Sequence, residues 1–154
     1  MQIAQVAPLY ESVPPKYYGG TERVVSYLTE ERIHYMGELK DGQKDAFLGQ
    51  AQALLFPIDW PEPFGLVMIE ALACSTPVIA YRRGSVPEVL EDGVTGWIME
   101  GLEEAVQAVE RVPMLSRPRC RQVFEERFSA SRMTRDDLRL YRRVVRAGKG
   151  RSAA

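Results

Sequence analysis

The sequence predicts an α/β fold in which one layer of parallel strands is flanked by helices. The prediction starts from an apolar run of strand length at 53–56, which a proline-broken loop follows. Residues 66–74 then contain strong helix formers and no breaker. Pro77 stops this helix, and residues 78–81 form a second buried run. A strand, loop, helix and strand in this order make one unit of a parallel sheet.

The segments before this unit predict one more strand and two more helices. Residues 2–7 are of low polarity, include β-branched side chains and predict a short strand that Pro8 ends. Gly19 and Gly20 lead into a helix that Thr21 can cap. The helices are expected at 21–29 and 41–49, the second with Ala46, Phe47 and Leu48 as its apolar side.

The segments after the unit predict a short strand and several helices. Ser85 can cap a helix that starts at Val86 or Pro87, and Glu88 stands three residues on, as in a capping box. The later elements are a strand at 96–99 and helices at 102–112, 119–127 and 131–145, with a frayed tail at 148–154. Arginines 139, 142, 143 and 146 predict a solvated face or a site for an acidic partner.

Composition places the chain among soluble globular proteins of about one domain. It has 154 residues, 45% of them hydrophobic and 27% charged. The net charge of −1 gives no field that would attract nucleic acid or an anionic membrane. Cys74 and Cys120 are far apart and lack a metal-site pattern, so we expect reduced thiols in the cytoplasm. No apolar run reaches the roughly 20 residues of a membrane span, and no signal peptide is recognised.

Two carboxylates flank the start of the helix at 66–74. Glu62 lies in the loop before it and Glu70 lies within it. The amides of Phe64, Gly65 and Leu66 are near the amino end of the helix, where unpaired N–H groups and a partial positive charge suit a phosphate. Carboxylates on either side could accept hydrogen bonds from sugar hydroxyls. A nucleotide sugar presents a ribose diol, a diphosphate and sugar hydroxyls in this order, which matches a carboxylate, a helix end and a second carboxylate. The alternative is that both glutamates are surface residues with structural roles.

Several motifs extend this pattern over nearly the whole chain. They are residues 60–74, with Glu62 and Glu70 separated by seven residues, together with 84–89, 91–96 and 19–22. They resemble the motifs of the retaining glycosyltransferases of group 1 with the GT-B fold. The resemblance implies that Glu70 holds the ribose hydroxyls, that Glu62 holds the donor sugar, and that the amides of Phe64, Gly65 and Leu66 face the sugar and phosphates.

The same resemblance implies roles for the Gly19–Gly20 turn and for one unusual serine. The amides of Gly19 and Gly20 are expected near the donor phosphates or the acceptor. No tightly bound metal or cofactor is implied beyond the nucleotide-sugar donor, whose UDP, GDP or ADP type stays open. Ser75 stands where the family usually has glycine, at a position that favours a left-handed backbone.

The chain is strongly shortened relative to that family. Residues 1–30 resemble the start of the amino-terminal domain, and residues 31–147, beginning with a strand at 31–37, resemble the latter part of the carboxy-terminal domain. The family's catalytic-region histidine and its diphosphate-gripping arginine and lysine have no counterpart, and we expect the lone His34 to be packed in the sheet.

The shortening leads to a specific fold prediction. We expect one Rossmann-like or flavodoxin-like parallel sheet of about five strands, in which the strand at 3–7 lies beside the strand at 53–56. Exchange of that first strand with another copy is the alternative.

Three functions follow from these observations. The chain could transfer a sugar from a nucleotide donor with retention, as the family does. It could instead bind a nucleotide or nucleotide sugar without turnover. It could also be a non-catalytic remnant that acts through a partner or a homo-oligomer.

Overall fold

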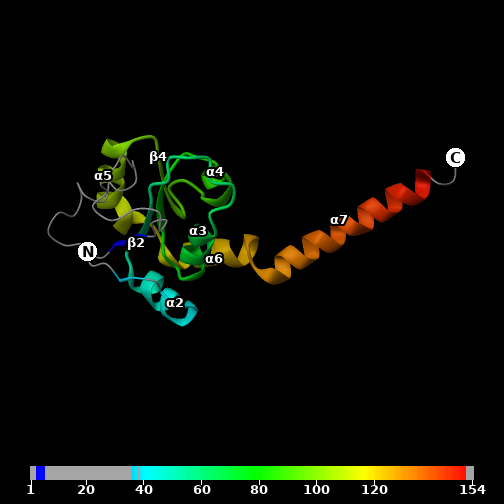
Figure 1. The fold of residues 1–154 in the computed structure, drawn as a ribbon, viewed down its shortest axis with the longest axis horizontal. Coiled ribbons are helices and arrows are strands. Elements are labelled where there is room, and N and C mark those ends of the chain that lie inside the picture. The colour runs from blue at the N-terminus through cyan, green and yellow to red at the C-terminus, as the bar shows by residue number, and fades with distance from the viewer. Residues whose placement is uncertain (1–2, 6–35, 38, 152–154) are drawn as a thin grey trace.

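A computed structural model describes residues 3–5, 36–37 and 39–151, which form an α/β body and one projecting helix (Figure 1). The sheet has four parallel strands in the order β1 (Ile3–Gln5), β2 (Ala53–Phe56), β3 (Val78–Tyr81) and β4 (Gly96–Met99). Ile3 lies opposite Ala53, and Leu55 lies opposite Ile79. The predicted α/β class and the predicted pairing of the first strand with residues 53–56 are therefore confirmed.

Some predicted features lie outside the described residues. These are the Gly19–Gly20 turn, the helix at 21–29, most of the strand at 31–37 and His34. Within the described part of the chain, the helices follow the predicted order closely. They are α2 (Asp41–Gln50), α3 (Leu66–Ala73), α4 (Val86–Val89), α5 (Leu102–Arg111), the 3-10 helix η1 (Val112–Met114), α6 (Arg117–Arg127) and α7 (Ala130–Arg151).

Each face of the sheet has its own hydrophobic core, because successive strand residues point to opposite faces. On one face, Leu54 and Val78 are buried together with Leu48 of α2, Met68 of α3 and Cys120 of α6. On the other face, Leu55, Ile79 and Met99 pack with Ala105 and Ala108 of α5. Figure 1 accordingly shows α5 on one side of the sheet and α3 and α6 on the other. The central strands β2 and β3 are buried throughout, as is typical of parallel sheets.

Helix α3 ends in a Schellman motif built around Ser75. The amide of Thr76 donates to the carbonyl of Ala71 at 2.8 Å, and the amide of Ser75 donates to that of Leu72 at 3.0 Å. This geometry gives Ser75 a φ of 61°, the left-handed conformation that the sequence predicts for this position. Thr76, which is fully buried, donates its hydroxyl to the carbonyl of Leu48 and so ties the turn to α2.

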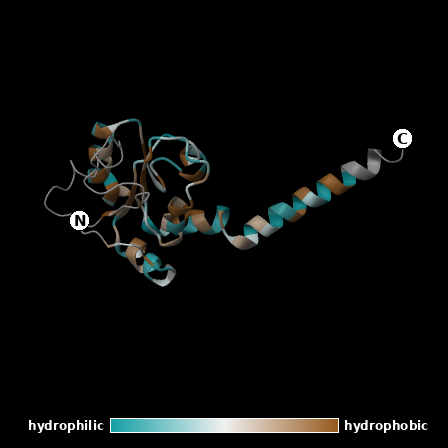
Figure 2. Cartoon of the chain, viewed as in Figure 1, coloured by the Kyte–Doolittle hydropathy of each residue, from teal (hydrophilic) through white to brown (hydrophobic). Residues whose placement is uncertain are grey.

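Helix α7 leaves the body and extends as a single arm (Figure 1). It runs to Arg151 and so continues past residue 148, where the tail was expected to begin. Figure 2 shows hydrophobic and hydrophilic residues alternating along it. Among the described residues, no helix combines the length and the apolar character needed to cross a lipid bilayer.

Candidate functional site

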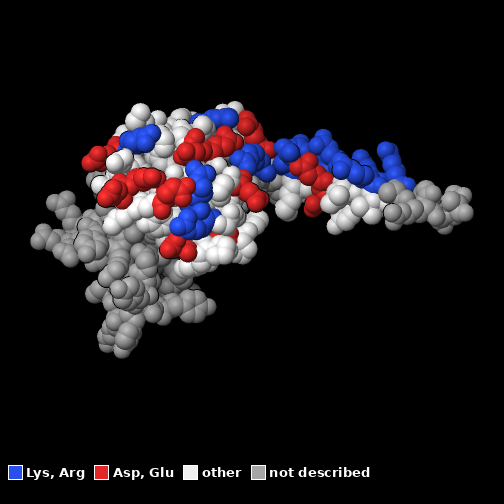
Figure 3. Space-filling view, turned by 90° about the horizontal axis from the view of Figure 1, so that it is seen from above, with Lys and Arg blue, Asp and Glu red and all other residues white. Residues whose placement is uncertain are grey.

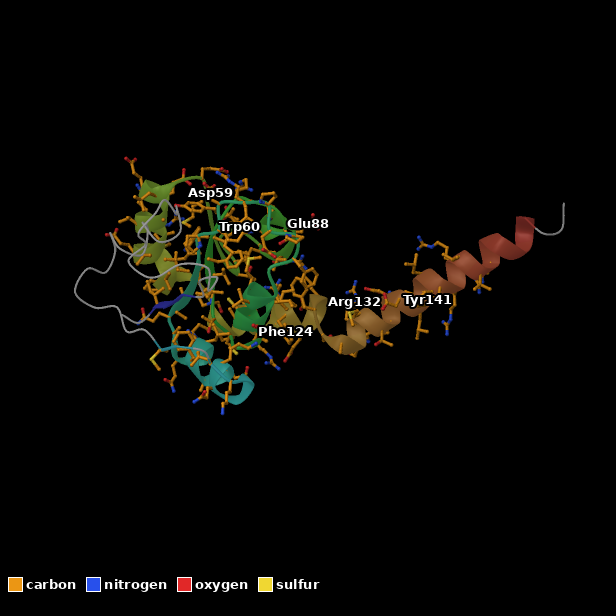
Figure 4. The ribbon with its side chains drawn as sticks, viewed as in Figure 1. Asp59, Trp60, Glu88, Phe124, Arg132 and Tyr141 are labelled. Carbon is orange, nitrogen blue, oxygen red and sulfur yellow. The ribbon has the colours of Figure 1, made fainter. Side chains whose placement is uncertain are left out.

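The candidate site lies where the loop after β2 enters α3. In a parallel sheet, the loops that follow successive strands emerge at the same edge, where α/β proteins bind ligands. The loops after β2 and β3 therefore share this edge. Figure 4 shows Asp59 and Trp60 of the first loop, and Glu88 of α4, on the body of the molecule. The site is built from residues 59–70 and from the segment after β3.

Gly65 sets the direction in which the chain enters α3. It is the N-cap residue and has a φ of 67°, a left-handed conformation that favours glycine. A Cβ atom here would lie 2.4 Å from Cε of Met68, which is fully buried in the core. Glycine is therefore favoured here mainly by the backbone angle, because the flexible end of Met68 could shift away from a Cβ atom.

The carboxylate of Glu62 lies against the amides that precede α3. Its Oε1 atom accepts hydrogen bonds from the amide of Gly65 at 3.2 Å and the amide of Phe64 at 3.4 Å. The Glu62 side chain is part-buried in this position. Two of the three amides predicted to face a ligand are therefore held by a carboxylate of the protein itself.

The next two amides, those of Leu66 and Val67, have no hydrogen-bond acceptor among the described residues. A glycine N-cap offers no side-chain oxygen, and the first turn of α3 has no acidic residue. The amino end of the helix thus presents unpaired N–H groups and a partial positive charge next to Glu62. This arrangement suits an anionic group such as a phosphate.

The loop that carries Glu62 is fixed to the segment after β3. The amide of Ser85 donates to the carbonyl of Glu62 at 2.9 Å. Gly84 has a φ of 49°, and a Cβ atom there would lie only 2.2 Å from the same carbonyl oxygen. The two loops consequently pack backbone against backbone, and this contact fixes the position of the Glu62 backbone relative to the segment after β3.

Ser85 corrects one prediction. The expected capping box with Glu88 is wrong, because the Ser85 side chain forms no cap hydrogen bond and its own backbone is helical. Its hydroxyl is instead buried without a hydrogen-bond partner among the described residues, 3.6 Å from where a Cβ of Gly65 would lie. The reason is the docking of the Ser85 amide on Glu62, which turns the residue toward the loop after β2.

Glu70 lies further along α3 and faces α2. Its Oε1 atom pairs with Nζ of Lys44 at 2.6 Å, and each side chain is about one-third exposed. Glu70 is therefore not a plain solvated helix residue. The ion pair orients its carboxylate, and the exposed part leaves room for further hydrogen bonds.

Arg82 and Arg83, at the carboxyl end of β3, are occupied by acidic neighbours. Arg82 pairs with Glu100 at 2.6 Å, and Arg83 pairs with Asp59 at 2.9 Å. Burial and the nearby Asp59 carboxylate raise the pKa of Tyr81, which lies at the same edge. These two arginines are thus neutralised within the protein and provide no free pair of cations for a diphosphate.

Three large apolar side chains close to Glu62 in sequence, two in the loop and one at the start of α3, are exposed. Trp60 is 43%, Phe64 55% and Leu66 62% exposed. Exposed aromatic and aliphatic groups next to a polar site are typical of a surface that meets a ligand or another chain. Among the described residues, no cluster of three or more His, Cys, Asp or Glu side chains could hold a metal ion.

The structure brings together most of the predicted site and adds two residues. Glu62, Phe64, Gly65 and Leu66 form one continuous turn, Glu70 lies apart beside α2, and the predicted Gly19 and Gly20 are outside the described residues. Lys44 lies in the predicted helix at 41–49, but no local signal in the sequence pairs it with Glu70. Ser85 has the pattern of a capping residue and instead docks its amide on the Glu62 carbonyl.

Comparison with known proteins identifies the family. The sequence profile described as "Glycosyl transferases group 1" matches residues 21–125, which is more than half of the chain. An N-acetyl-alpha-D-glucosaminyl L-malate synthase of Bacillus anthracis is 30% identical over 128 residues, covering 78% of this chain and 33% of the relative. A D-inositol 3-phosphate glycosyltransferase of Saccharomonospora viridis is 38% identical over 98 residues, covering 58% of this chain and 22% of the relative.

Solved structures show the same fold. Sucrose-phosphate synthase of Thermosynechococcus elongatus superimposes with a TM-score of 0.67 at 24% identity, over 94% of this chain and 38% of that one. HepE of Anabaena in complex with UDP-glucose gives a TM-score of 0.63 at 21% identity, over 78% and 35%. The chain spans about a third or less of the length of the curated relatives named above. The chain therefore belongs to the group 1 glycosyltransferases of the GT-B fold.

Proposed function

We propose that this chain binds a nucleotide sugar at the amino end of α3, as the donor-binding part of a group 1 glycosyltransferase. The observation that carries the proposal is the combination of unpaired amides at Leu66 and Val67 with the adjacent Glu62 carboxylate. The amides suit a phosphate, and the carboxylate suits sugar hydroxyls. Both groups lie at the edge of the sheet where α/β proteins bind ligands.

In this proposal the two glutamates bind opposite ends of the donor. Glu70, oriented by its ion pair with Lys44, accepts hydrogen bonds from the ribose hydroxyls. Glu62 gives up its hydrogen bonds to the amides of Phe64 and Gly65 and accepts from the donor sugar, while those amides and that of Leu66 meet the phosphates. The HepE complexes with UDP and with UDP-glucose support a uridine nucleotide as the first candidate donor.

The proposed reaction is transfer of the sugar to an acceptor with retention at the anomeric carbon, without a bound metal. Catalysis would come from positioning and from stabilising the diphosphate leaving group at the helix end. In this proposal the amides of Gly19 and Gly20 also contact the donor phosphates or the acceptor, as the family resemblance implies. The free thiols of Cys74 and Cys120 support a reducing, cytoplasmic location.

Binding without turnover is the second candidate, and the pairing of Arg82 and Arg83 favours it. A leaving diphosphate needs cations, and both of these guanidinium groups are already bound to acidic residues. In that case the chain would bind a nucleotide sugar but would lack cations to stabilise the nucleoside diphosphate as it leaves.

Calorimetric titration tests the proposed site directly. UDP, GDP, ADP and their glucose conjugates are titrated into the native chain and into Glu70→Gln. We expect one nucleotide series to bind and the variant to weaken it at least tenfold, or about 1.4 kcal/mol, because the ribose loses a charged acceptor.

Glu88→Gln is the matched control, since Glu88 is exposed and its carboxylate has no partner among the described residues. It should bind as the native chain does, and circular dichroism should show all three proteins folded. Absence of binding to every nucleotide would reject the proposal. Release of free nucleoside diphosphate from a bound donor would separate the enzyme from the binding module.

A further inference from the structure

Helix α7 exposes an apolar face that nothing in the described structure covers. Six large hydrophobic residues on it are between 48% and 66% exposed: Met133, Leu138, Leu140, Tyr141, Val144 and Val145. Leu138, Tyr141 and Val145 are three and four residues apart, Leu140 and Val144 are four apart, and Met133 is seven residues before Leu140, so the six lie on one side of the helix. Figure 4 shows Tyr141 well out along the arm, beyond Arg132 near its base.

The opposite side of α7 is strongly basic. Arginines 132, 135, 139, 142, 143 and 146 occupy it, accompanied by Asp136. Figure 3 shows these cations as a nearly continuous row along the arm, whereas acidic side chains are spread over the visible face of the body. Residues 130–151 include eight basic and two acidic residues, a net charge of +6. Since the whole chain has a net charge of −1, the remainder has −7.

This separation of charge argues that the partner of α7 is a protein surface with a net negative charge, like that of the body. An acidic body would be repelled by an anionic lipid surface. Asp137 also lies within the apolar face of α7, where a hydrocarbon environment would make a carboxylate costly. A second copy of this chain offers the opposite charge and a protein surface.

Helix α5 has the complementary pattern. Leu102 and Val106 form an exposed apolar strip on it, about 40% exposed, and Glu103 and Glu110 border that strip. Neither glutamate forms an ion pair among the described residues. The two are seven residues apart, which is about 10 Å along a helix.

Arg135 and Arg142 on α7 are also seven residues apart. They border the apolar face beside Leu138 and Val145, and within the described chain neither has an acidic partner. The arginine pair on α7 can therefore lie beside the glutamate pair on α5. The apolar strips of the two helices would then be buried against each other, as in helix pairs with charged flanks.

We propose that α7 of one copy docks on α5 of a second copy, and that the exchange is reciprocal in a two-fold dimer. Such an interface is isologous, so each chain contributes one basic arm and one acidic helix. The contacts are the apolar strips of both helices and ion pairs from Arg135 and Arg142 to Glu103 and Glu110.

Sedimentation equilibrium of the full chain tests the dimer, and a charge exchange tests its geometry. We expect the native chain to dimerise. Arg135→Glu with Arg142→Glu should weaken the dimer at least tenfold, and Glu103→Arg with Glu110→Arg should do the same. The variant with all four changes should recover most of the affinity, because the ion pairs form again with reversed sign.

Arg139→Glu with Arg146→Glu is the matched control, since it makes the same change of charge on the side of α7 opposite its apolar face. It should dimerise more strongly than the Arg135 and Arg142 variant. A native chain that stays monomeric overturns the proposal, as does an equal effect of both arginine pairs or a failure of the four-fold variant to recover. A monomer that co-sediments with phosphatidylserine vesicles would replace the second copy by a membrane.

Discussion

Gly84 controls the distance between the two loops that form the candidate site. Its φ of 49° is left-handed, and a Cβ atom here would lie 2.2 Å from the Glu62 carbonyl oxygen and 2.5 Å from the Glu62 nitrogen, which leaves no space for a side chain. A methyl group there would overlap backbone atoms, which cannot rotate away as the end of a flexible side chain can. The position of Glu62 therefore depends on a residue with no functional group of its own.

We predict that Gly84→Ala lowers the free energy of unfolding by more than about 2 kcal/mol, through backbone strain and separation of the loops. Urea unfolding followed by circular dichroism measures the change. Gly42→Ala is the control, because its site in α2 is open and helical. That change should be neutral or stabilising by up to about 1 kcal/mol; equal effects of the two substitutions would contradict the prediction.

Cys120 gives the body a pH dependence in the alkaline range. It is fully buried in the core below α3, and its thiol lies 3.8 Å from the carbonyl oxygen of Thr95. Burial raises the pKa of this thiol from 9.0 to about 11. The folded state therefore keeps a proton that the unfolded state releases as the pH rises above 9.

We predict that this group's contribution to stability is complete below about pH 8 and is lost as the pH rises toward 11, by about 2 kcal/mol in total. Urea unfolding at a series of pH values measures the loss. Cys120→Ala should be less stable at neutral pH because of a cavity, yet its stability should fall less steeply above pH 9. Parallel curves for the two proteins would show that Cys120 is not the cause.

At the scale of elements, the sequence predicts the β2–α3–β3 unit well, for a physical reason. Buried parallel strands need continuous apolar runs, and Pro77 and the helix formers of α3 leave few alternatives. The left-handed conformation of Ser75 is likewise local, because it follows from the position of this residue just after the end of α3.

Contacts between distant segments could not be predicted in this way. The Ser85 amide docks on Glu62, and Lys44 pairs with Glu70, because the fold brings loops and helices together that are far apart in sequence. A capping-box pattern considers only neighbours in the chain, so it gave Ser85 the wrong role. For Ser85, the contact with the distant Glu62 therefore decides its conformation, and the capping pattern of the neighbouring residues does not.

Arg117 is the strongest example of such a contact. Its guanidinium group donates to the carbonyls of Ala51 at 2.5 Å and Gly49 at 2.7 Å, and to the hydroxyl of Thr76 at 3.1 Å. It thereby joins the start of α6 to the end of α2 and to the turn after α3. Nothing in the local sequence around Arg117 indicates these acceptors.

We predict that Arg117→Ala lowers the free energy of unfolding by about 2–3 kcal/mol, since three acceptors lose a charged donor. Arg117→Lys should recover part of this, because an ammonium group cannot span all three. Arg119→Ala is the control: its ion pairs with Glu91 and Glu126 are long and partly exposed, so it should cost less than about 1 kcal/mol. Thermal and urea unfolding of the three variants decide between these outcomes.

At the scale of the whole molecule, the acidic body and the basic arm have opposite charges and are joined by one short turn between α6 and α7. The arm buries none of its apolar face in the described chain. Its stability must therefore come from its own helical hydrogen bonds or from a second molecule.

We predict that the thermal midpoint of the native chain rises with protein concentration, because a dimer that forms only from folded chains stabilises them by mass action. Differential scanning fluorimetry measures this dependence of the midpoint on concentration. A dilution series of about a hundredfold is wide enough for a clear shift. The variant with Arg135→Glu and Arg142→Glu should have a flatter dependence. A native midpoint that is independent of concentration would count against coupling between folding and dimerisation.

Among the described strands, β1 lies at the edge of the sheet, and this position has a consequence for biosynthesis. Ile3, Ala4 and Gln5 pair with Ala53, Leu54 and Leu55, so β1 has to wait for these partners until residues 53–55 have also left the ribosome. Throughout that interval its backbone donors and acceptors are open to solvent and to chaperones. Closing so long a connection also carries an entropic cost before the first interstrand hydrogen bond forms. This strand therefore pairs late, although it is translated well before its partner.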